Sequence, residues 1–483
     1  MKNLDPTPAG RPRWRLRLSL RAMMALILVI GLPLGWKVRR ASTQRRAVAV
    51  VRAMGWQISY EDEINPQGFP RLPHRPWGPA WLRRWVGDEF FEEVGYVNID
   101  ARLHLGRVDD DSLAAVGDFD RLQGLTIWWP RDQGDGQDRG QITAAGLARL
   151  TGLRRLRVLH LLGVPTDPAM VALLSRWTTL EDVELRDLGH PQGTLPGSCL
   201  AHLARLPGLR KVIITTLASC RAADVEPLTR LAHLEQLGLT RSAPSDAGVA
   251  RFGSLPTLQV LSLPQTELTE PTLAELARIP GLGSLDFDGS RLPAGGLRAL
   301  AGLTRLTYLN VAVDGLAGQP NAHHLIHRVR PRFGDDDLDA LERVPLRDLM
   351  LMGMDATDAG VGRLLRSHSF VGLTLGGRGI TDASIPLLVQ QTGLRGLVLA
   401  DTSITDAGLA QLKAIGGLRT LSLVDNARLT DTGVSGLAAF PALSYLTIRQ
   451  PAVRSATLDA IRAARSKVGP SFNLFQPPEA GAR

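Results

Sequence analysis

Two short segments place charged side chains at alternate positions, the spacing that puts them on one face of a β-strand. Asp182 and Glu184 are followed by Arg186, and Asp286 is followed by Asp288. Carboxylates that lie side by side can act as a general acid and a general base. The sequence contains no G-x-S-x-G, H-E-x-x-H, G-x-x-x-x-G-K-[ST] or C-x-x-C motif to complete a catalytic or cofactor site. We therefore predict that the protein is not an enzyme and has no catalytic residues and no cofactor.

Histidines and carboxylates also gather in residues 314–336. His323 and His327 are four residues apart, which would place them on one face of a helix, and three aspartates follow at 335–337. Such groups are zinc ligands. The residues that directly follow these two histidines, a third histidine and an arginine, would crowd the pair, and nothing fixes the geometry of the segment. We predict no metal site and interpret the segment as a solvated loop, open to contact with a partner.

The elements that must position these residues repeat along the chain. The pattern apolar-x-x-apolar-x-apolar occurs fourteen times, from "VGYVNI" at 94–99 to "LSYLTI" at 443–448. Most units follow one another at a constant spacing, as at Leu234, Leu258, Leu282 and Leu306, and one longer step accommodates the insertion at 314–336. The alternation at the end of each unit is typical of a half-buried strand. A fifteenth strand is expected at 471–475.

A second phrase recurs between the strands, as in "ITDAGLAQL" at 404–412. Thr405 is suited to cap a helix, and Asp406 would lie in its first turn, where a negative charge favours the helix dipole. Gly408 is unusual because glycine inside a helix costs about 0.5–1 kcal/mol relative to alanine. Since several repeats keep this glycine, we expect it to allow close approach of neighbouring backbones where the helices stack.

These units together resemble the leucine-rich repeat, in the helix-bearing variety of ribonuclease-inhibitor-like proteins and F-box repeat proteins. The basic leader, apolar segment and repeats also resemble bacterial membrane-anchored leucine-rich-repeat proteins. The resemblance implies an α/β solenoid of about 14–15 repeats over 94–475, with a parallel sheet on the concave side and helices on the convex side. It says little about activity, because fold does not imply function.

In such a solenoid the residues between the inward-facing leucines point outward and form the default binding surface. We expect the ligand-binding side chains of the concave face among the aromatic, charged and sulfur-containing residues at these positions. They are Tyr96, Trp128, His160, Asp182, Glu184, Arg186, Asp286, Asp288, Tyr308, Asn310, Met350, Met352 and Tyr445.

The leader carries the excess positive charge. Residues 1–52 hold twelve Lys or Arg and one acidic residue, whereas the whole chain has a net charge of +9, so the remainder is close to neutral. A nucleic-acid-binding body would carry its own basic face, and we predict no nucleic acid partner. We expect a basic cytoplasmic tail (1–21), a transmembrane anchor (22–36), a juxtamembrane linker (37–78), a cap helix (79–93) whose tryptophans cover the open core, and a disordered tail (476–483).

The anchor assignment leaves alternatives open. Fifteen helical residues span about 22 Å, less than a hydrocarbon core of about 30 Å, so a cleaved signal peptide and a peripheral segment remain alternatives. A short basic tail before the apolar run favours an N-terminus inside the cell. The expected location is therefore the cell membrane, single-pass, with the repeats outside the cytoplasm.

Three classes of function are compatible with these features. The favoured one is a membrane-anchored repeat protein that binds a protein or polypeptide ligand on its concave face. The second is a structural, self-associating envelope protein. The third is a substrate adaptor of a degradation or signalling complex, which rests on the resemblance to F-box repeat proteins alone.

Overall fold

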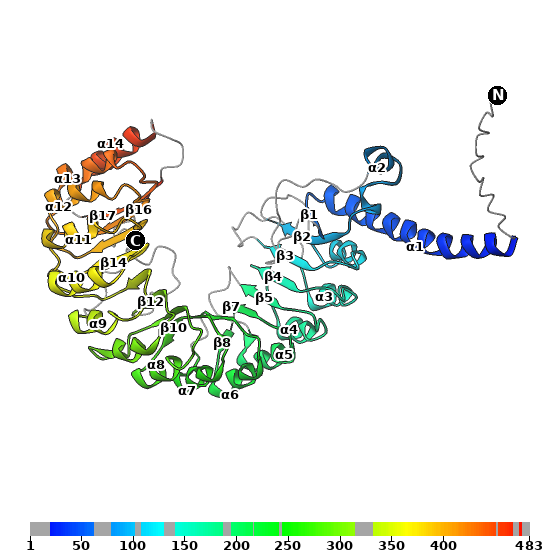
Figure 1. The fold of residues 1–483 in the computed structure, drawn as a ribbon, viewed down its shortest axis with the longest axis horizontal. Helices are drawn as coiled ribbons and strands as arrows, with labels where there is room; N and C mark the ends of the chain where they lie inside the picture. Colours follow the sequence, from blue (N-terminus) through cyan, green and yellow to red (C-terminus); the bar gives the residue numbers. More distant parts are fainter. Residues whose placement is uncertain are drawn as a thin grey trace, which may run out of the picture.

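The computed structural model describes residues 20–61, 79–101, 108–129, 141–186, 195–215, 217–240, 244–313, 332–450, 453–466 and 473–475. These residues form an open arc whose inner side is a continuous sheet and whose outer side is a layer of short helices (Figure 1). The helix N-terminal to the arc projects from one end of it. The repeat pattern thus folds as a solenoid.

The sheet has sixteen strands within the described residues, and they pair in chain order apart from two short strands that pair with each other. β1 is antiparallel to β2, and the following strands are all parallel. The strands of the large sheet are β1 (Gln57–Tyr60), β2 (Val94–Asp100), β3 (Gly124–Trp128), β4 (Val158–Leu162), β5 (Asp182–Arg186), β7 (Lys211–Ile214), β9 (Gln236–Leu239), β10 (Val260–Glu267), β11 (Ser284–Asp288), β12 (Tyr308–Ala312), β13 (Asp348–Leu351), β14 (Gly372–Gly376), β15 (Gly396–Ala400), β16 (Thr420–Val424), β17 (Tyr445–Arg449) and β18 (Asn473–Phe475). The separate pair is β6 (Leu195–Pro196) and β8 (Leu217–Ser219).

Apart from the long α1, which precedes the first strand, the helices are short, and several continue into a turn of 3-10 helix such as Leu412–Ala414. They are α1 (Leu20–Ala53), α2 (Ala80–Val86), α3 (Ala144–Arg149), α4 (Pro168–Leu174), α5 (Leu200–Leu203), α6 (Ala222–Val225), α7 (Asp246–Ala250), α8 (Glu270–Leu276), α9 (Asp335–Ala340), α10 (Asp358–Ser367), α11 (Ile385–Val389), α12 (Asp406–Gln411), α13 (Asp431–Ser435) and α14 (Ser455–Ser466).

The core lies between the sheet and the helices. On each strand the apolar residues at alternate positions point inward, and the parallel register stacks each of them on its equivalent, as Leu285 does on Leu261 and Leu309. The leucines before each strand and on the inner helix face complete the same cluster, which is continuous along the arc. Each repeat therefore buries its apolar face against its two neighbours, which is why one repeat cannot fold alone.

The phrase "TDAG" joins one repeat to the next. Thr405 caps α12, because its hydroxyl accepts the N–H of Ala407. The backbone N–H of Thr405 in turn donates to the Asp382 carboxylate of the preceding repeat, at 2.8 Å, and its hydroxyl donates to the same carboxylate. Asp406 accepts the equivalent two hydrogen bonds from Thr430 of the following repeat. The aspartate thus holds the next helix in place as well as lying in the first turn of its own.

The position of the Asp382 carboxylate beside α12 explains why residue 408 is a glycine. A Cβ atom at Gly408 would lie 2.1 Å from Oδ1 of Asp382, and the glycines at 146, 360 and 433 face the preceding aspartate in the same way. We expected these glycines to admit a neighbouring backbone. The structure instead shows that they make room for a carboxylate side chain. Gly248 fits the original expectation better, since a Cβ there would lie 3.0 Å from Cα of Ala222.

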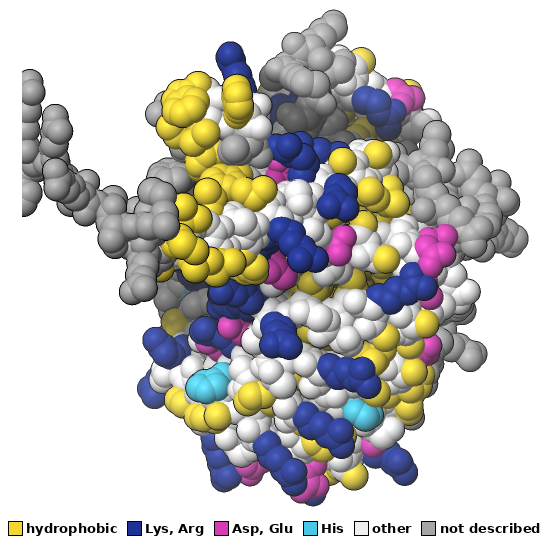
Figure 2. Space-filling view, turned by 90° about the vertical axis from the view of Figure 1, so that its right-hand side faces the viewer, with side chains coloured by type: hydrophobic (Ala, Val, Ile, Leu, Met, Phe, Trp, Pro, Cys, Tyr) yellow, Lys and Arg dark blue, Asp and Glu magenta, His cyan; other side chains and the backbone are white. Residues whose placement is uncertain are grey.

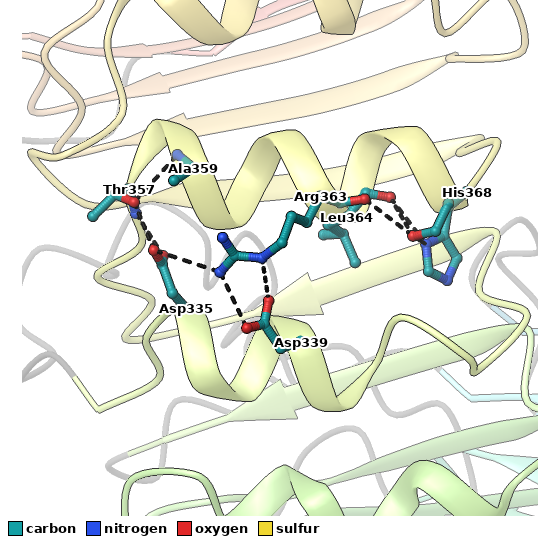
Figure 3. A network of polar contacts seen from close by, with 8 residues as sticks. Asp335, Asp339, Thr357, Ala359, Arg363, Leu364 and His368 are labelled. Carbon is teal, nitrogen blue, oxygen red and sulfur yellow. Dashed lines mark hydrogen bonds and ion pairs between the residues drawn. The ribbon is translucent and has the colours of Figure 1, made fainter.

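Figure 3 shows the same device between α9 and α10, with two further links on one helix. The Asp335 carboxylate accepts both hydrogen bonds from Thr357. Arg363 forms a two-pronged ion pair with Asp339 at 2.6 and 3.1 Å. At the far end of α10, the buried His368 lies 2.6 Å from the carbonyl oxygen of Val344 in the preceding repeat. Polar contacts therefore fix the spacing of successive helices at both ends.

The N-terminal end of the core is covered by the second half of α1. Val48 and Val51 are buried in the same cluster as the first repeats, and the buried side-chain amide of Gln44 donates to the carbonyl oxygen of Glu92 at 2.8 Å. Arg40 adds ion pairs to Glu93 and Asp120. Residues 41–60, which we expected within a linker, thus form a helix and a strand that belong to the solenoid.

A helix, α2, forms within the segment expected to be the cap, but its tryptophans do not cover the core. Trp81 and Trp85 of α2 are exposed, at 68% and 87% of their full surface, so they cover no core. Figure 2 shows hydrophobic side chains gathered at this end of the molecule. Trp77, which precedes these two at the same spacing of four residues, lies outside the described residues. Aromatic spacing alone does not distinguish a stripe that faces a core from one that faces solvent, because both have the same period.

The first half of α1 was expected to be a transmembrane anchor over 22–36. Large apolar side chains are exposed from Ile27 to Val38. Among the described residues, no helix combines the length and the hydropathy that crossing a membrane requires.

Candidate ligand-binding surface

The concave surface is built from the outward positions of the strands. Because the register is in step from strand to strand, equivalent side chains form rows that run across the sheet. One row passes through Val158, Asp182 and Lys211, and the next passes through His160 and Glu184. The predicted residues fall on these rows, so the sheet brings together side chains that come from successive repeats and are distant in the sequence.

A polar cluster spans β2 to β7 on this surface. The Tyr96 hydroxyl is hydrogen bonded to Thr126, whose hydroxyl lies 3.5 Å from Nδ1 of His160. Nε2 of His160 lies 3.1 Å from the Asp182 carboxylate. Gly124 makes this arrangement possible, because a Cβ there would lie 2.3 Å from the Tyr96 ring. The tyrosine ring can therefore lie across β3.

Opposite charges compensate one another at the other end of this cluster. The Lys211 ammonium lies 3.2 Å from Asp182 and 3.4 Å from Glu184, and Arg186 is ion paired with Glu184. Burial alone would raise the pKa of the Asp182 carboxyl, but the hydrogen bonds and charges of His160 and Lys211 outweigh burial and hold that pKa below its usual value. Asp182 is therefore ionised at neutral pH.

A second cluster lies on β10 to β13. The Asp286 carboxylate accepts hydrogen bonds from Ser262 and Asn310, both at 3.1 Å. Burial raises the pKa of Asp286 to about 6, although these two hydrogen bonds act in the opposite direction. The Tyr308 hydroxyl lies 3.8 Å from the sulfur of Met350 beside it. A second carboxylate, that of Asp348 on β13, lies in register with Tyr308, so the acidic groups of this cluster are not balanced in the way that those of the first cluster are.

The structure separates the predicted residues into three groups. Those on the outward rows and partly exposed are Trp128, Asp182, Arg186, Asp286, Tyr308, Asn310, Met350 and Tyr445. Those on the outward rows and nearly covered by their neighbours are Tyr96, His160 and Glu184. Two are buried at or just after the end of a strand, and these are Asp288 and Met352.

The last group is a correction of the alternation rule. Asp288 is only 2% exposed, and its carboxylate accepts the backbone N–H of Ser290 at 2.8 Å, so it stabilises the turn after β11. Met352 follows β13 and belongs to the hydrophobic core. The period of two holds only while the chain is extended, and it fails at the turn. Asp286 and Asp288 therefore do not form a pair on the surface.

Some members of the clusters were missed. Lys211 occupies the same row as Asp182, and Thr126 and Ser262 occupy the row of His160 and Asp286. The alternation that selected the predicted residues also marks these three as outward. They were passed over because a lysine in a strand and small hydroxyl residues carry no signal of their own.

The histidines of the 314–336 insertion lie outside the described residues. Asp335 and Asp337, which follow them, begin α9, where Asp337 is buried and accepts the backbone N–H groups of Gly295 and Leu297. Within the described part of the chain, no group of three His, Cys, Asp or Glu side chains is arranged to hold a metal ion. The two cysteines are free and buried.

Parallel strands that stack inward leucines, with a helix after each, decide the architecture. The fold is a leucine-rich-repeat solenoid. No protein-family model matches the chain, and no curated protein matches it. Among solved structures, the crystal structure of an internalin (inlF) from Listeria monocytogenes is similar over 69% of this chain and 82% of that chain, at 19% identity and a TM-score of 0.36. A similarity at this level adds nothing to what the geometry of the chain itself establishes.

Proposed function

We propose that the concave face binds a protein or polypeptide ligand, and that it acts by binding rather than by catalysis. The observation that supports this most directly is the cluster from Tyr96 to Lys211, which sets an aromatic ring, an imidazole and four charged groups on one outward surface. Ligand recognition by solenoids of this kind uses an extended concave surface. Tyrosine and arginine are the residue types enriched where proteins contact one another.

The partly exposed aromatic residues extend this surface along the arc. Trp128 lies next to the first cluster, Tyr308 belongs to the second, and Tyr445 lies on β17 near the C-terminal end. An extended polypeptide or the face of a folded protein could contact all three, whereas a small molecule would reach only one cluster. We therefore favour a macromolecular ligand over a metabolite.

The apolar half of α1 supports a proposal about location. From Ile27 to Trp36 the helix exposes large apolar side chains all round, and a helix that is apolar on every side needs an apolar environment. Lys37 and Arg39 follow where headgroups would lie. We propose that this half attaches the protein to a membrane, with the repeats outside the cytoplasm. A reporter fused to the C-terminus distinguishes the two orientations.

A charge swap tests the binding surface. Exchanging Asp182 and Lys211 (Asp182→Lys with Lys211→Asp) keeps the net charge and the ion pair between these two positions but reverses the charge pattern that a ligand meets. Because the exchange also removes the contacts of Asp182 with His160 and of Lys211 with Glu184, circular dichroism first confirms that the variant is folded. The matched control is the exchange of Glu226 and Arg251, which pair at 2.7 Å on the helical side. Both full-length variants are compared with the wild type by affinity capture from native membranes, and the affinity of each captured protein is then measured.

We expect the concave swap to weaken the partner at least about tenfold, which corresponds to about 1.4 kcal/mol, and the control swap to leave the affinity unchanged. If the concave swap retains every partner at wild-type affinity, the concave face is not the binding surface. Capture of further copies of the same chain, unaffected by either swap, would instead favour a self-associating structural protein.

A further inference from the structure

A hollow of about 520 Å³ lies on the edge of the solenoid where the strands begin, away from the concave face. Its walls come from four successive repeats, in the turns that precede β3, β4, β5 and β7, and Gln123 is the contribution of the first. Arg154 and Arg155 form one wall, Thr178 and Thr179 the next, and Gly208 the last. Neither the repeat pattern nor the proposed ligand surface accounts for this hollow.

The hollow exists because side-chain size changes abruptly between repeats. Arg154 and Arg155 occupy the two positions before the last leucine of the turn, and the same positions hold two threonines in the next repeat and a proline and glycine in the one after. Two long side chains therefore border a space that the small residues leave open. The remaining repeats place at most one basic residue at this pair of positions, Arg305 among them.

The charges around the hollow do not cancel. Glu181 is the carboxylate in its wall, and Arg157 binds both of its oxygens, at 2.8 and 2.7 Å. In the part of the chain that the structure describes, no acidic side chain forms an ion pair with Arg154 or Arg155. Two arginines that line the hollow are thus without a counter-ion among the described residues.

Hydrogen-bond donors are also left over there. The Thr179 hydroxyl is used within the fold, since it donates to the carbonyl oxygen of Leu156 at 2.7 Å. The hydroxyl and the backbone N–H of Thr178 have no acceptor among the described residues. The backbone N–H of Gly208 on the opposite wall has none either. Two arginine side chains and hydrogen-bond donors from two further repeats constitute an environment that favours an anion.

We propose that this hollow binds a ligand carrying a phosphate or sulfate group, held by the guanidinium groups of Arg154 and Arg155 and by the Thr178 donors. A tetrahedral oxyanion offers several acceptor oxygens, and the planar guanidinium fork matches them in pairs. A carboxylate would offer only two oxygens to donors that converge from three sides. The volume accommodates the rest of a small ligand, such as a sugar, beside the anionic group.

Calorimetric titration of the full-length protein tests this proposal with glucose 6-phosphate, glucose 6-sulfate and glucose as probes. We expect at least one anionic probe to bind with a Kd of about 1 mM or tighter at low salt, and glucose not to bind. The phosphate monoester carries about −1.5 to −2 charge near neutral pH and the sulfate monoester carries a single negative charge, so equal or tighter binding of the sulfate would identify a sulfate ligand, and tighter binding of the phosphate a phosphate ligand or a preference for charge. If neither anion binds in this range, the proposal is wrong.

Three variants locate the site. Arg154→Gln with Arg155→Gln removes both charges and should weaken binding at least about tenfold. Gly208→Trp should block the hollow, and it is compatible with the fold because a Cβ at Gly208 has no neighbour closer than 3.7 Å. The matched control is Arg305→Gln, which removes a basic residue from the position equivalent to Arg155 and should change the affinity less than twofold.

Two results would overturn the assignment. Unchanged affinity in the double arginine variant would show that these side chains do not hold the anion. An equal loss in Arg305→Gln would show that the anion responds to the general positive charge of this edge and not to a site. Neither result affects the proposed concave surface, because none of the three variants lies on it.

Discussion

The contact between Asp382 and Gly408 offers a quantitative test of how the repeats are joined. Gly408→Ala would place a Cβ 2.1 Å from Oδ1 and 2.7 Å from Cγ of Asp382, well inside van der Waals contact. The carboxylate must move away, and its two hydrogen bonds to Thr405 are then lost. Hydrogen bonds to a charged group contribute about 1.5–3 kcal/mol each when buried, and this pair is partly exposed, so we expect about 2–3 kcal/mol together.

The gain in helix propensity opposes this loss. Alanine is favoured over glycine in a helix by about 0.8–1 kcal/mol, so the net cost of Gly408→Ala is about 1–2 kcal/mol. Asp382→Ala loses the same hydrogen bonds without a steric clash, at about 2–3 kcal/mol. In that background Gly408→Ala should no longer destabilise, because the carboxylate is absent. Ile404 Cγ2, at 3.1 Å from the new Cβ, limits any gain.

The assay is urea unfolding of the two single variants and the double variant, followed by circular dichroism, with hydrogen exchange of the α12 amides as a local probe. The control is Gly416→Ala, where a Cβ meets nothing within 4 Å, and we expect it to stay within about 0.5 kcal/mol of the wild type. If Gly408→Ala costs nothing, or costs as much with Asp382→Ala as without it, the carboxylate is not the reason for the glycine.

Two further perturbations have clear expected outcomes. The raised pKa of Asp286, about 6, means that its protonated form is the one the fold favours. Its contribution to stability is therefore full below pH 4 and is lost as the pH rises through 6. Asp286→Asn should increase the free energy of unfolding at pH 8 by up to about 3 kcal/mol and should change it little at pH 4. Urea titration at both pH values measures the two effects, and equal effects would contradict the argument that burial raises the pKa of Asp286. Deletion of residues 1–38 should leave the thermal midpoint of the solenoid unchanged. Deletion of residues 1–53 should lower that midpoint because Val48 and Val51 cover the core. Equal midpoints for the two deletions would show that α1 does not stabilise the solenoid.

The architecture could be predicted well from the sequence because each repeat has the same pattern of apolar residues. The leucines of successive units stack on one another, so the constant spacing of the units translates directly into strand order and register. The threonine cap of α12 was likewise readable from local residue types. The partner of each aspartate was not, because Asp382 meets Thr405 only after the helices have been stacked. Local patterns specify an element, and the register of the solenoid specifies the contacts between elements.

Predictions failed where the local pattern had more than one structural outcome. Residues 41–53 were expected within a juxtamembrane linker, and only the burial of Val48 and Val51 identifies them as a helix that covers the core. Asp288 has the same spacing from Asp286 as Asp286 has from Ser284. The chain nevertheless turns after Asp288, and the Asp288 carboxylate binds the backbone of that turn instead of lying on the surface. The candidate binding surface could thus be located by alternation, but its limits depend on where each strand ends.

The two halves of the sheet indicate what the fold itself requires of its outward positions. On β14, β16 and β17 the row of His160 and Glu184 holds small hydroxyl residues, namely Thr374, Ser422 and Thr447, and the register is maintained. Folding is therefore satisfied without charge at these positions. Transferring ions from water to a partly buried site costs free energy that their mutual attraction only partly offsets. Replacing His160 and Glu184 by threonine should consequently leave the free energy of unfolding nearly unchanged while removing any ligand that depends on them, and a loss of several kcal/mol would instead identify this cluster as part of the architecture.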